Sequence, residues 1–101
     1  MFEGIDKIRA AAEALATRDV DLKQRLVEAG EKFWAAAFHY PDWPPHLQER
    51  AEQIQSLILA QGTVAQTVPQ MNPDAARQAA HEILRFMVEF EIAYRKASGE
   101  I

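Results

Sequence analysis

The stretch that decides the fold is Phe33-Trp34-Ala35-Ala36-Ala37-Phe38-His39-Tyr40-Pro41-Asp42-Trp43-Pro44-Pro45-His46. It holds five of the nine aromatic residues, three of the five prolines and two of the three histidines. A residue that precedes a proline is disfavoured in the α conformation, so a helix that enters this stretch is predicted to end at Pro41. Pro45 suits the first position of the next helix, where its missing N–H costs nothing. The stretch therefore predicts a short connection between two helices.

The segments on both sides of this connection are also helical in pattern. Glycine and proline are almost absent from three long stretches, and apolar residues recur there at spacings of three and four. Alternation with a period of two, which would indicate strands, is not sustained anywhere. The chain is therefore predicted to be all-α and to form a single domain over residues 1–101. Four helices joined by short connections predict an antiparallel up-and-down four-helix bundle.

The number of helices before the aromatic stretch is open. Thr17-Arg18-Asp19 has the composition of a tight turn, in which Asp19 would cap a second helix. The spacing of apolar residues nevertheless runs unbroken from Ile5 to Phe33, which is compatible with one helix of about 35 residues. The alternative fold is therefore a three-helix bundle with one long N-terminal helix.

Local signals divide the second half of the chain. The third helix is predicted to run from Pro45 to near Gln61, because Gly62 suits the residue after a helix end. Thr63 and Gln66 have the spacing of a capping box, which predicts a further short turn. Asn72-Pro73-Asp74 combines an N-cap, a first-turn proline and an acid, and predicts a final helix of about 25 residues that ends at Ser98-Gly99.

Composition excludes several classes of protein. Apolar residues make up 49% of the 101 residues and charged residues 26%, which is typical of an ordinary globular domain. The absence of cysteine excludes disulfides, thiolate metal sites and a cysteine nucleophile. The net charge of −4 is spread along the chain, so no basic surface for nucleic acid or for an anionic membrane is expected. The first residues lack the pattern of a signal peptide and no apolar run could span a membrane, so a cytoplasmic location is predicted.

His81 is the strongest candidate for chemistry. A histidine on a helix of a bundle is similar to the histidine phosphotransfer domains, but those have a basic residue and then a glycine where this chain has Leu84 and Arg85. Arg77 and His81 are also similar to the arginine–histidine pair of HEPN-type ribonucleases, with one fewer intervening residue than the shortest spacing in that family. A solvated surface histidine is the preferred interpretation, and a phosphotransfer or RNA-processing role of His81 is the alternative.

No metal or cofactor site is predicted. Carboxylate-rich bundles bind metals with a glutamate three residues before a histidine. In this chain those positions hold Ala36, Trp43 and Gln78. The two serines do not lie in a nucleophile elbow, and the four glycines do not cluster into a phosphate-binding loop.

The aromatic residues have two interpretations. Phe33, Trp34 and Phe38 have the spacing of core residues. Tyr40 and Trp43 either cap the open end of the bundle or, together with Pro44, form an exposed platform for a peptide or a small molecule.

Two features indicate a protein partner. Leu84, Val88 and Ile92 form a second apolar stripe on the final helix, about 100–200° from the centre of its main stripe. This stripe either widens the burial of the helix within the fold or is covered by a partner. The 21 residues Gln53–Pro73 contain no charge, as is common in interfaces, although this segment could also fold back across the bundle. The predicted function is therefore a non-catalytic module that self-associates as a homodimer or binds another protein. The predicted contacts are Leu84, Val88 and Ile92, with Tyr40 and Trp43 as a separate contact at the rim.

Overall fold

A computed structural model describes residues 3–16 and 21–99, and within these ranges it contains helices and no strands. The prediction of an all-α fold is confirmed. The elements in chain order are α1 (Ile5–Ala16), α2 (Leu22–Ala36), the 3-10 helix η1 (Ala37–Asp42), α3 (Pro45–Ile58), α4 (Val64–Thr67), the 3-10 helix η2 (Val68–Gln70) and α5 (Pro73–Ala97).

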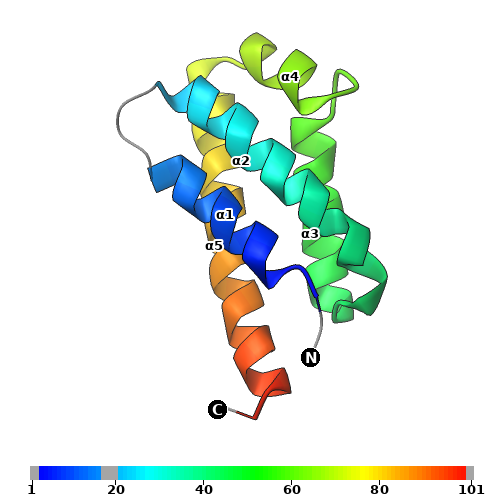
Figure 1. Ribbon diagram of the computed structural model, residues 1–101. Coiled ribbons are helices and arrows are strands. Elements are labelled where there is room, and N and C mark those ends of the chain that lie inside the picture. The colour runs from blue at the N-terminus through cyan, green and yellow to red at the C-terminus, as the bar shows by residue number, and fades with distance from the viewer. Residues whose placement is uncertain (1–2, 17–20, 100–101) are drawn as a thin grey trace.

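The longest helix, α5, is the centre of the packing. It contacts α1, α2 and α3, while α1 also lies alongside α2 (Figure 1). The short helix α4 covers one end of the molecule, where it packs on α2. The helices α2 and α3 are joined by η1 and do not pack closely along their lengths.

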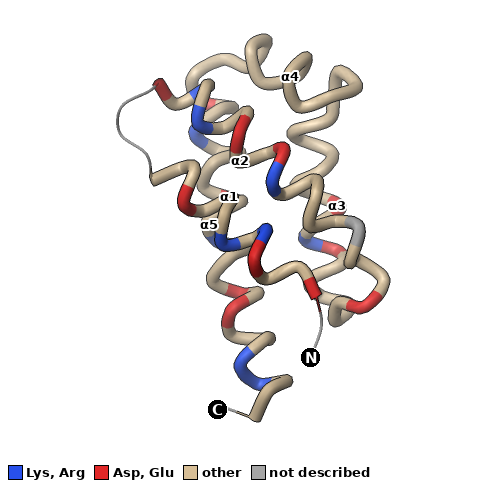
Figure 2. Tube along the Cα trace, in the orientation of Figure 1, with Lys and Arg blue, Asp and Glu red and all other residues tan. Residues whose placement is uncertain are grey.

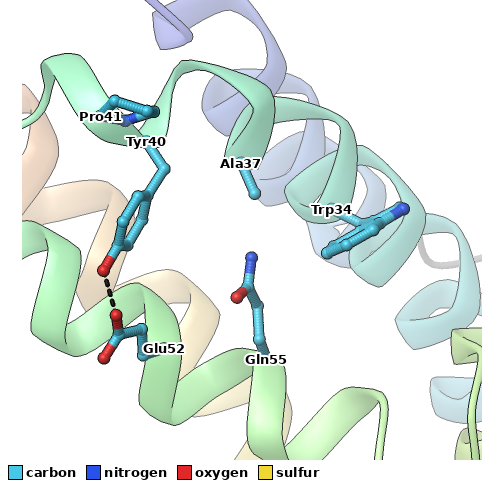
Figure 3. A pocket seen from close by; sticks show the side chains of 6 residues that line it. All are labelled: Trp34, Ala37, Tyr40, Pro41, Glu52 and Gln55. Carbon is cyan, nitrogen blue, oxygen red and sulfur yellow. Dashed lines mark hydrogen bonds between the residues drawn. The ribbon is translucent and has the colours of Figure 1, made fainter.

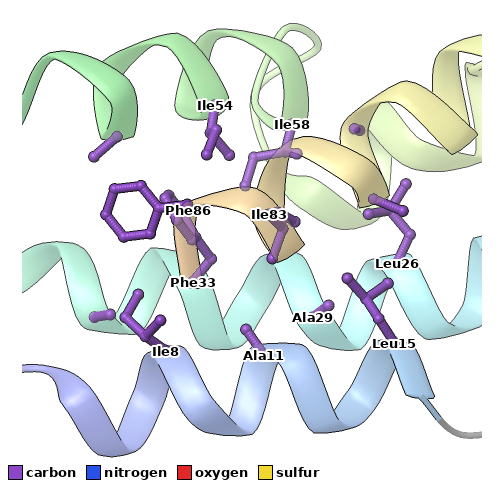
Figure 4. Packing of buried hydrophobic residues seen from close by; sticks show 14 of the residues in the cluster. Ile8, Ala11, Leu15, Leu26, Ala29, Phe33, Ile54, Ile58, Ile83 and Phe86 are labelled. Atoms are coloured by element: carbon purple, nitrogen blue, oxygen red, sulfur yellow. The ribbon is translucent and has the colours of Figure 1, made fainter. Parts of the chain in front are cut away.

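The core lies where the four long helices face one another. Figure 4 shows side chains from all four pointing into this space. Phe33 of α2 meets Phe86 of α5 edge to face, with ring centroids 5.1 Å apart, an arrangement that aromatic pairs favour. On α3 the apolar residues Leu47, Ala51, Ile54 and Ile58, which recur at spacings of three and four, are buried. Core formation on this helix therefore follows the helical spacing of its apolar residues.

Several helix ends form as their local chemistry predicts. The Asn72 side chain accepts a hydrogen bond from the Ala75 N–H at 2.7 Å and begins α5, with Pro73 as its first residue. Ser98 is the C-cap of α5, and Gly99 follows in the left-handed region at φ 79°. Thr63 and Gln66 form the predicted capping box of α4.

The boundaries in the first half of the chain correct two predictions. Helices α1 and α2 are separate, so the single helix of about 35 residues is wrong. The N-cap of α2 is Asp21, whose carboxylate accepts from the Gln24 N–H at 2.9 Å. The predicted cap, Asp19, lies outside the described residues. The α conformation of α2 also ends before Pro41, because the chain tightens into η1, which contains that proline.

The uncharged segment Gln53–Pro73 folds back across the end of the molecule. Figure 2 shows this part of the chain without acidic or basic residues. Helix α3 ends at Ile58, three residues before the predicted end, and Gly62 makes the following turn with φ 112°. Val64 and Val68 are buried, so part of this segment completes the core. Among the described residues, no helix has both the length and the apolar character needed to cross a membrane.

Candidate functional site

The second apolar stripe of α5 lies on its outer surface. Leu84, Val88 and Ile92 are exposed by 40%, 52% and 46%. The core residues Ile83 and Phe90 lie on the opposite side of the same helix and are buried. Whether the stripe belongs to the core was open from the sequence, and the structure places all three side chains at the surface.

Shallow grooves border the stripe on both sides. A groove of 450 Å³ is lined by Met87, Val88, Glu91, Ile92 and Arg95. A smaller one of 170 Å³ is lined by His46, Glu89, Ile92, Ala93 and Lys96. The apolar side chains therefore stand between two depressions, and the edges of both depressions carry charged groups.

Ion pairs fix the position of α5 below this surface. The carboxylate of Glu91 binds Arg9 of α1 through two hydrogen bonds of 2.5 and 3.1 Å. The hydrogen bond from Arg9 and its positive charge lower the pKa of Glu91, and the same contact raises the pKa of Arg9. Arg50 of α3 forms two ion pairs with α5. Its Nη2 atom lies 3.3 Å from Oε2 of Glu82, and its Nε atom lies 3.6 Å from Oε2 of Glu89. These contacts tie α5 to α1 and α3, so the stripe is presented on a helix with a fixed orientation.

Trp43 is not at the surface, which corrects its assignment as a contact at the rim. Its side chain is 2% exposed. The indole packs against Phe86 and Phe90 with centroid distances of 5.7 and 5.1 Å. The indole N–H donates to the backbone carbonyl of Glu3 at 2.7 Å. Because this hydrogen bond satisfies the polar group, the whole ring can be buried in the core.

The exposed ring near the aromatic connection belongs instead to Trp34, which is exposed by 45% although its spacing predicted a core residue. It lines a groove of 440 Å³ together with Ala37, Tyr40, Pro41, Glu52 and Gln55 (Figure 3). Tyr40 is half-buried and donates a hydrogen bond to Glu52. The side chain of Phe38 lies outside the described residues.

The predicted aromatic platform included Tyr40, whereas Trp34, Glu52 and Gln55 were not predicted to line a groove. Glu52 and Gln55 are ordinary polar residues on the outer face of a helix, and only the packing of α3 beside η1 brings them near the aromatic rings.

His81 has no assembled site around it. The imidazole is exposed on α5, while Arg77 pairs with Asp74 and Arg85 lies 3.9 Å from Glu82. The neighbouring cations are thus directed to carboxylates on their own helix. Within the described ranges, no group of three or more histidine, aspartate or glutamate side chains could hold a metal ion.

Comparison with known proteins gives no relative: no family model, no curated protein and no solved structure matches this chain. Inference about function therefore rests on the surfaces described above.

Proposed function

We propose that this chain is a non-catalytic helical module that self-associates as a homodimer through the outer face of α5. The observation that carries the proposal is the exposure of Leu84, Val88 and Ile92 on successive turns of one helix. A contiguous apolar patch on a small protein commonly marks a contact surface. The proposal treats the four long helices as an up-and-down bundle, in which α5 has an inner face for the core and an outer face for a partner.

The stripe is complementary to itself. A two-fold axis passing beside Val88, with the two copies of α5 antiparallel, would place Leu84 of one copy against Ile92 of the other. Residues equally far from the axis then face each other, as in any isologous interface. The spacing of the apolar side chains thus supports this arrangement.

Because the stripe is complementary to itself, we prefer a second copy of the chain over a different protein as its partner. Binding of a different protein is the alternative that the test distinguishes. A cytoplasmic location is part of the proposal and rests on the sequence alone. The alternative function, phosphotransfer or RNA processing by His81, has no assembled set of groups to support it. Under the proposal, His81→Ala leaves self-association unchanged.

Light scattering coupled to size-exclusion chromatography tests the proposal over a hundredfold range of concentration. The wild-type chain is expected to show the mass of two copies, and Val88→Asp the mass of one, because a carboxylate would be desolvated in the interface. Leu57→Asp is the matched control, since Leu57 is a similarly exposed apolar residue on α3, 41% accessible and away from the stripe. Its variant should keep the dimer mass.

The opposite results are equally informative. A wild-type monomer at every concentration would overturn the homodimer and leave the stripe to a different protein. If Val88→Asp unfolds the chain, as judged by circular dichroism, the side chain contributes to the core and its assignment to an interface is wrong. If Leu57→Asp also dissociates the dimer, the interface lies elsewhere than on α5.

A further inference from the structure

The groove between α2, η1 and α3 combines aromatic rings with a carboxylate. Trp34 and Tyr40 approach it from the α2 and η1 side, and Glu52 and Gln55 approach it from α3 (Figure 3). Its volume of 440 Å³ falls in the range of roughly 300–1,000 Å³ that is usual for small-molecule sites. This surface is distinct from the stripe on α5 and shares no residue with it.

The charge of the groove is negative and uncompensated. Glu52 is the only charged residue among the six that line it. No arginine, lysine or histidine of the described residues forms an ion pair with Glu52. On the other side of Trp34 a second cavity of 320 Å³ includes Glu31 and again has no basic residue in its lining. The indole therefore borders two depressions, each with one glutamate and no basic residue in its lining.

The carboxylate and the phenol hold each other in place. Tyr40 donates its hydroxyl hydrogen to Glu52, and this hydrogen bond is the main reason that the pKa of Tyr40 is raised. The hydrogen bond to Glu52 holds the ring of Tyr40 at the groove. The ring of Tyr40 is also packed 6.3 Å from that of Trp43, which is anchored in the core. One wall of the groove is thus rigid before any ligand binds.

Gln55 supplies a neutral polar group between the two rings. Its side chain is half-buried and makes no hydrogen bond to another described residue. An amide can donate and accept at once. It could therefore bind a hydroxyl or carbonyl group attached to a cation that lies between the rings.

We propose that this groove binds a small organic ammonium ion, with the cationic head between Trp34 and Tyr40 and near Glu52, and a short polar tail at Gln55. Aromatic faces attract such cations through the ring quadrupole, and tryptophan does so most strongly. A carboxylate beside them favours the cation over a neutral molecule of the same shape. The fixed wall at Tyr40 reduces the cost of ordering the site when the ligand arrives.

The test compares choline with 3,3-dimethylbutan-1-ol, in which a carbon atom replaces the charged nitrogen while the shape is kept. The readout is the two-dimensional NMR spectrum of the ¹⁵N-labelled full chain, because its two tryptophans give two indole N–H signals. Choline is expected to shift the signal of Trp34 in a saturable way and to leave that of buried Trp43 in place. The neutral analogue should bind about fivefold more weakly than choline, because it cannot form the cation–π contact.

Two variants separate the charge of Glu52 from general electrostatic attraction. Glu52→Gln keeps an oxygen that accepts from Tyr40 and is expected to weaken choline binding about fivefold, because the attraction between two unit charges in water is lost. Glu49→Gln removes an equal charge from an exposed position on α3 outside the groove and should leave the affinity unchanged. The proposal is overturned if the two ligands bind equally, if Trp34 shows no shift with choline at tens of millimolar, or if both glutamate variants lose affinity to the same extent.

Discussion

Gly30 lies in the middle of α2, where a glycine weakens a helix by about 1 kcal/mol relative to alanine. Its surroundings explain its presence. A Cβ atom at this position would stand 2.8 Å from the Cγ1 atom of Val64, on the helix α4 that covers the end of the molecule. The missing side chain therefore allows α4 to approach α2 closely and to bury Val64.

Gly30→Ala is accordingly expected to lower the free energy of unfolding by about 1–2 kcal/mol, although alanine is the better helix former, because the added methyl group overpacks the contact with Val64. Urea denaturation followed by circular dichroism measures the change. The same exchange in a Val64→Ala background should be neutral or stabilising, since the clash is gone. A simple gain in stability from Gly30→Ala alone would contradict the close contact.

Glu91 gives a prediction for acid solution. Its pKa is lowered in the folded protein by the hydrogen bond from Arg9, from an ordinary value of 4.5. A lowered pKa contributes stability that is fully present above the unfolded value and is lost as the pH falls through the folded value. Thermal denaturation of Glu91→Gln and wild type should therefore differ at neutral pH and converge as the pH falls below 4.5. Glu49→Gln, at an exposed position, should match the wild type at neutral pH.

At the scale of the element, the start of α5 depends on one side chain. Asn72 accepts a hydrogen bond from the Ala75 N–H at 2.7 Å and so satisfies one of the free donors of the first turn. Asn72→Ala is expected to lower the stability by about 1 kcal/mol, measured by thermal or urea denaturation. Asn72→Asp is the control, because aspartate also caps and its charge suits the N-terminus of a helix. Equal losses in both variants would mean that the cap does not stabilise α5.

At the scale of the whole molecule, the parts predicted from the sequence are those with a local cause. Pro45, Asn72 and Gly99 mark helix ends through their own backbone and side-chain chemistry, without reference to distant residues. The stripe of Leu84, Val88 and Ile92 was found from spacing alone, because helical periodicity assigns residues to faces. Its place at the surface needed the structure, since the sequence does not say how many faces of α5 its neighbours cover.

The parts that could not be predicted depend on contacts between distant segments. Trp43 is buried because the carbonyl of Glu3, 40 residues earlier in the chain, accepts its indole N–H. Without that partner a tryptophan beside three prolines is expected at the rim. Glu52 and Gln55 likewise become groove residues only because α3 runs beside η1. Neither fact has a signal in the local sequence.

The arrangement of the proposed dimer leads to a prediction about cross-linking. The chain has no cysteine, so a single introduced thiol reports one contact. In the antiparallel arrangement Val88 faces its own copy at the two-fold axis, and the Cα atoms of a disulfide must lie within about 7 Å. Val88→Cys is therefore expected to form a covalent dimer on mild oxidation, detected by non-reducing electrophoresis, and Leu57→Cys is not.

A mixture of Leu84→Cys and Ile92→Cys chains tests the direction of the helices, because each residue lies four positions from the axis on opposite sides of Val88. Antiparallel helices bring Leu84 of one chain to Ile92 of the other, so the mixed disulfide should predominate over either homodimer when one of the chains carries a tag that changes its mobility. Parallel helices would instead bring each cysteine to its own counterpart. Predominant homodimers in both cases would keep the apolar stripe as the interface and overturn the antiparallel arrangement of the two helices.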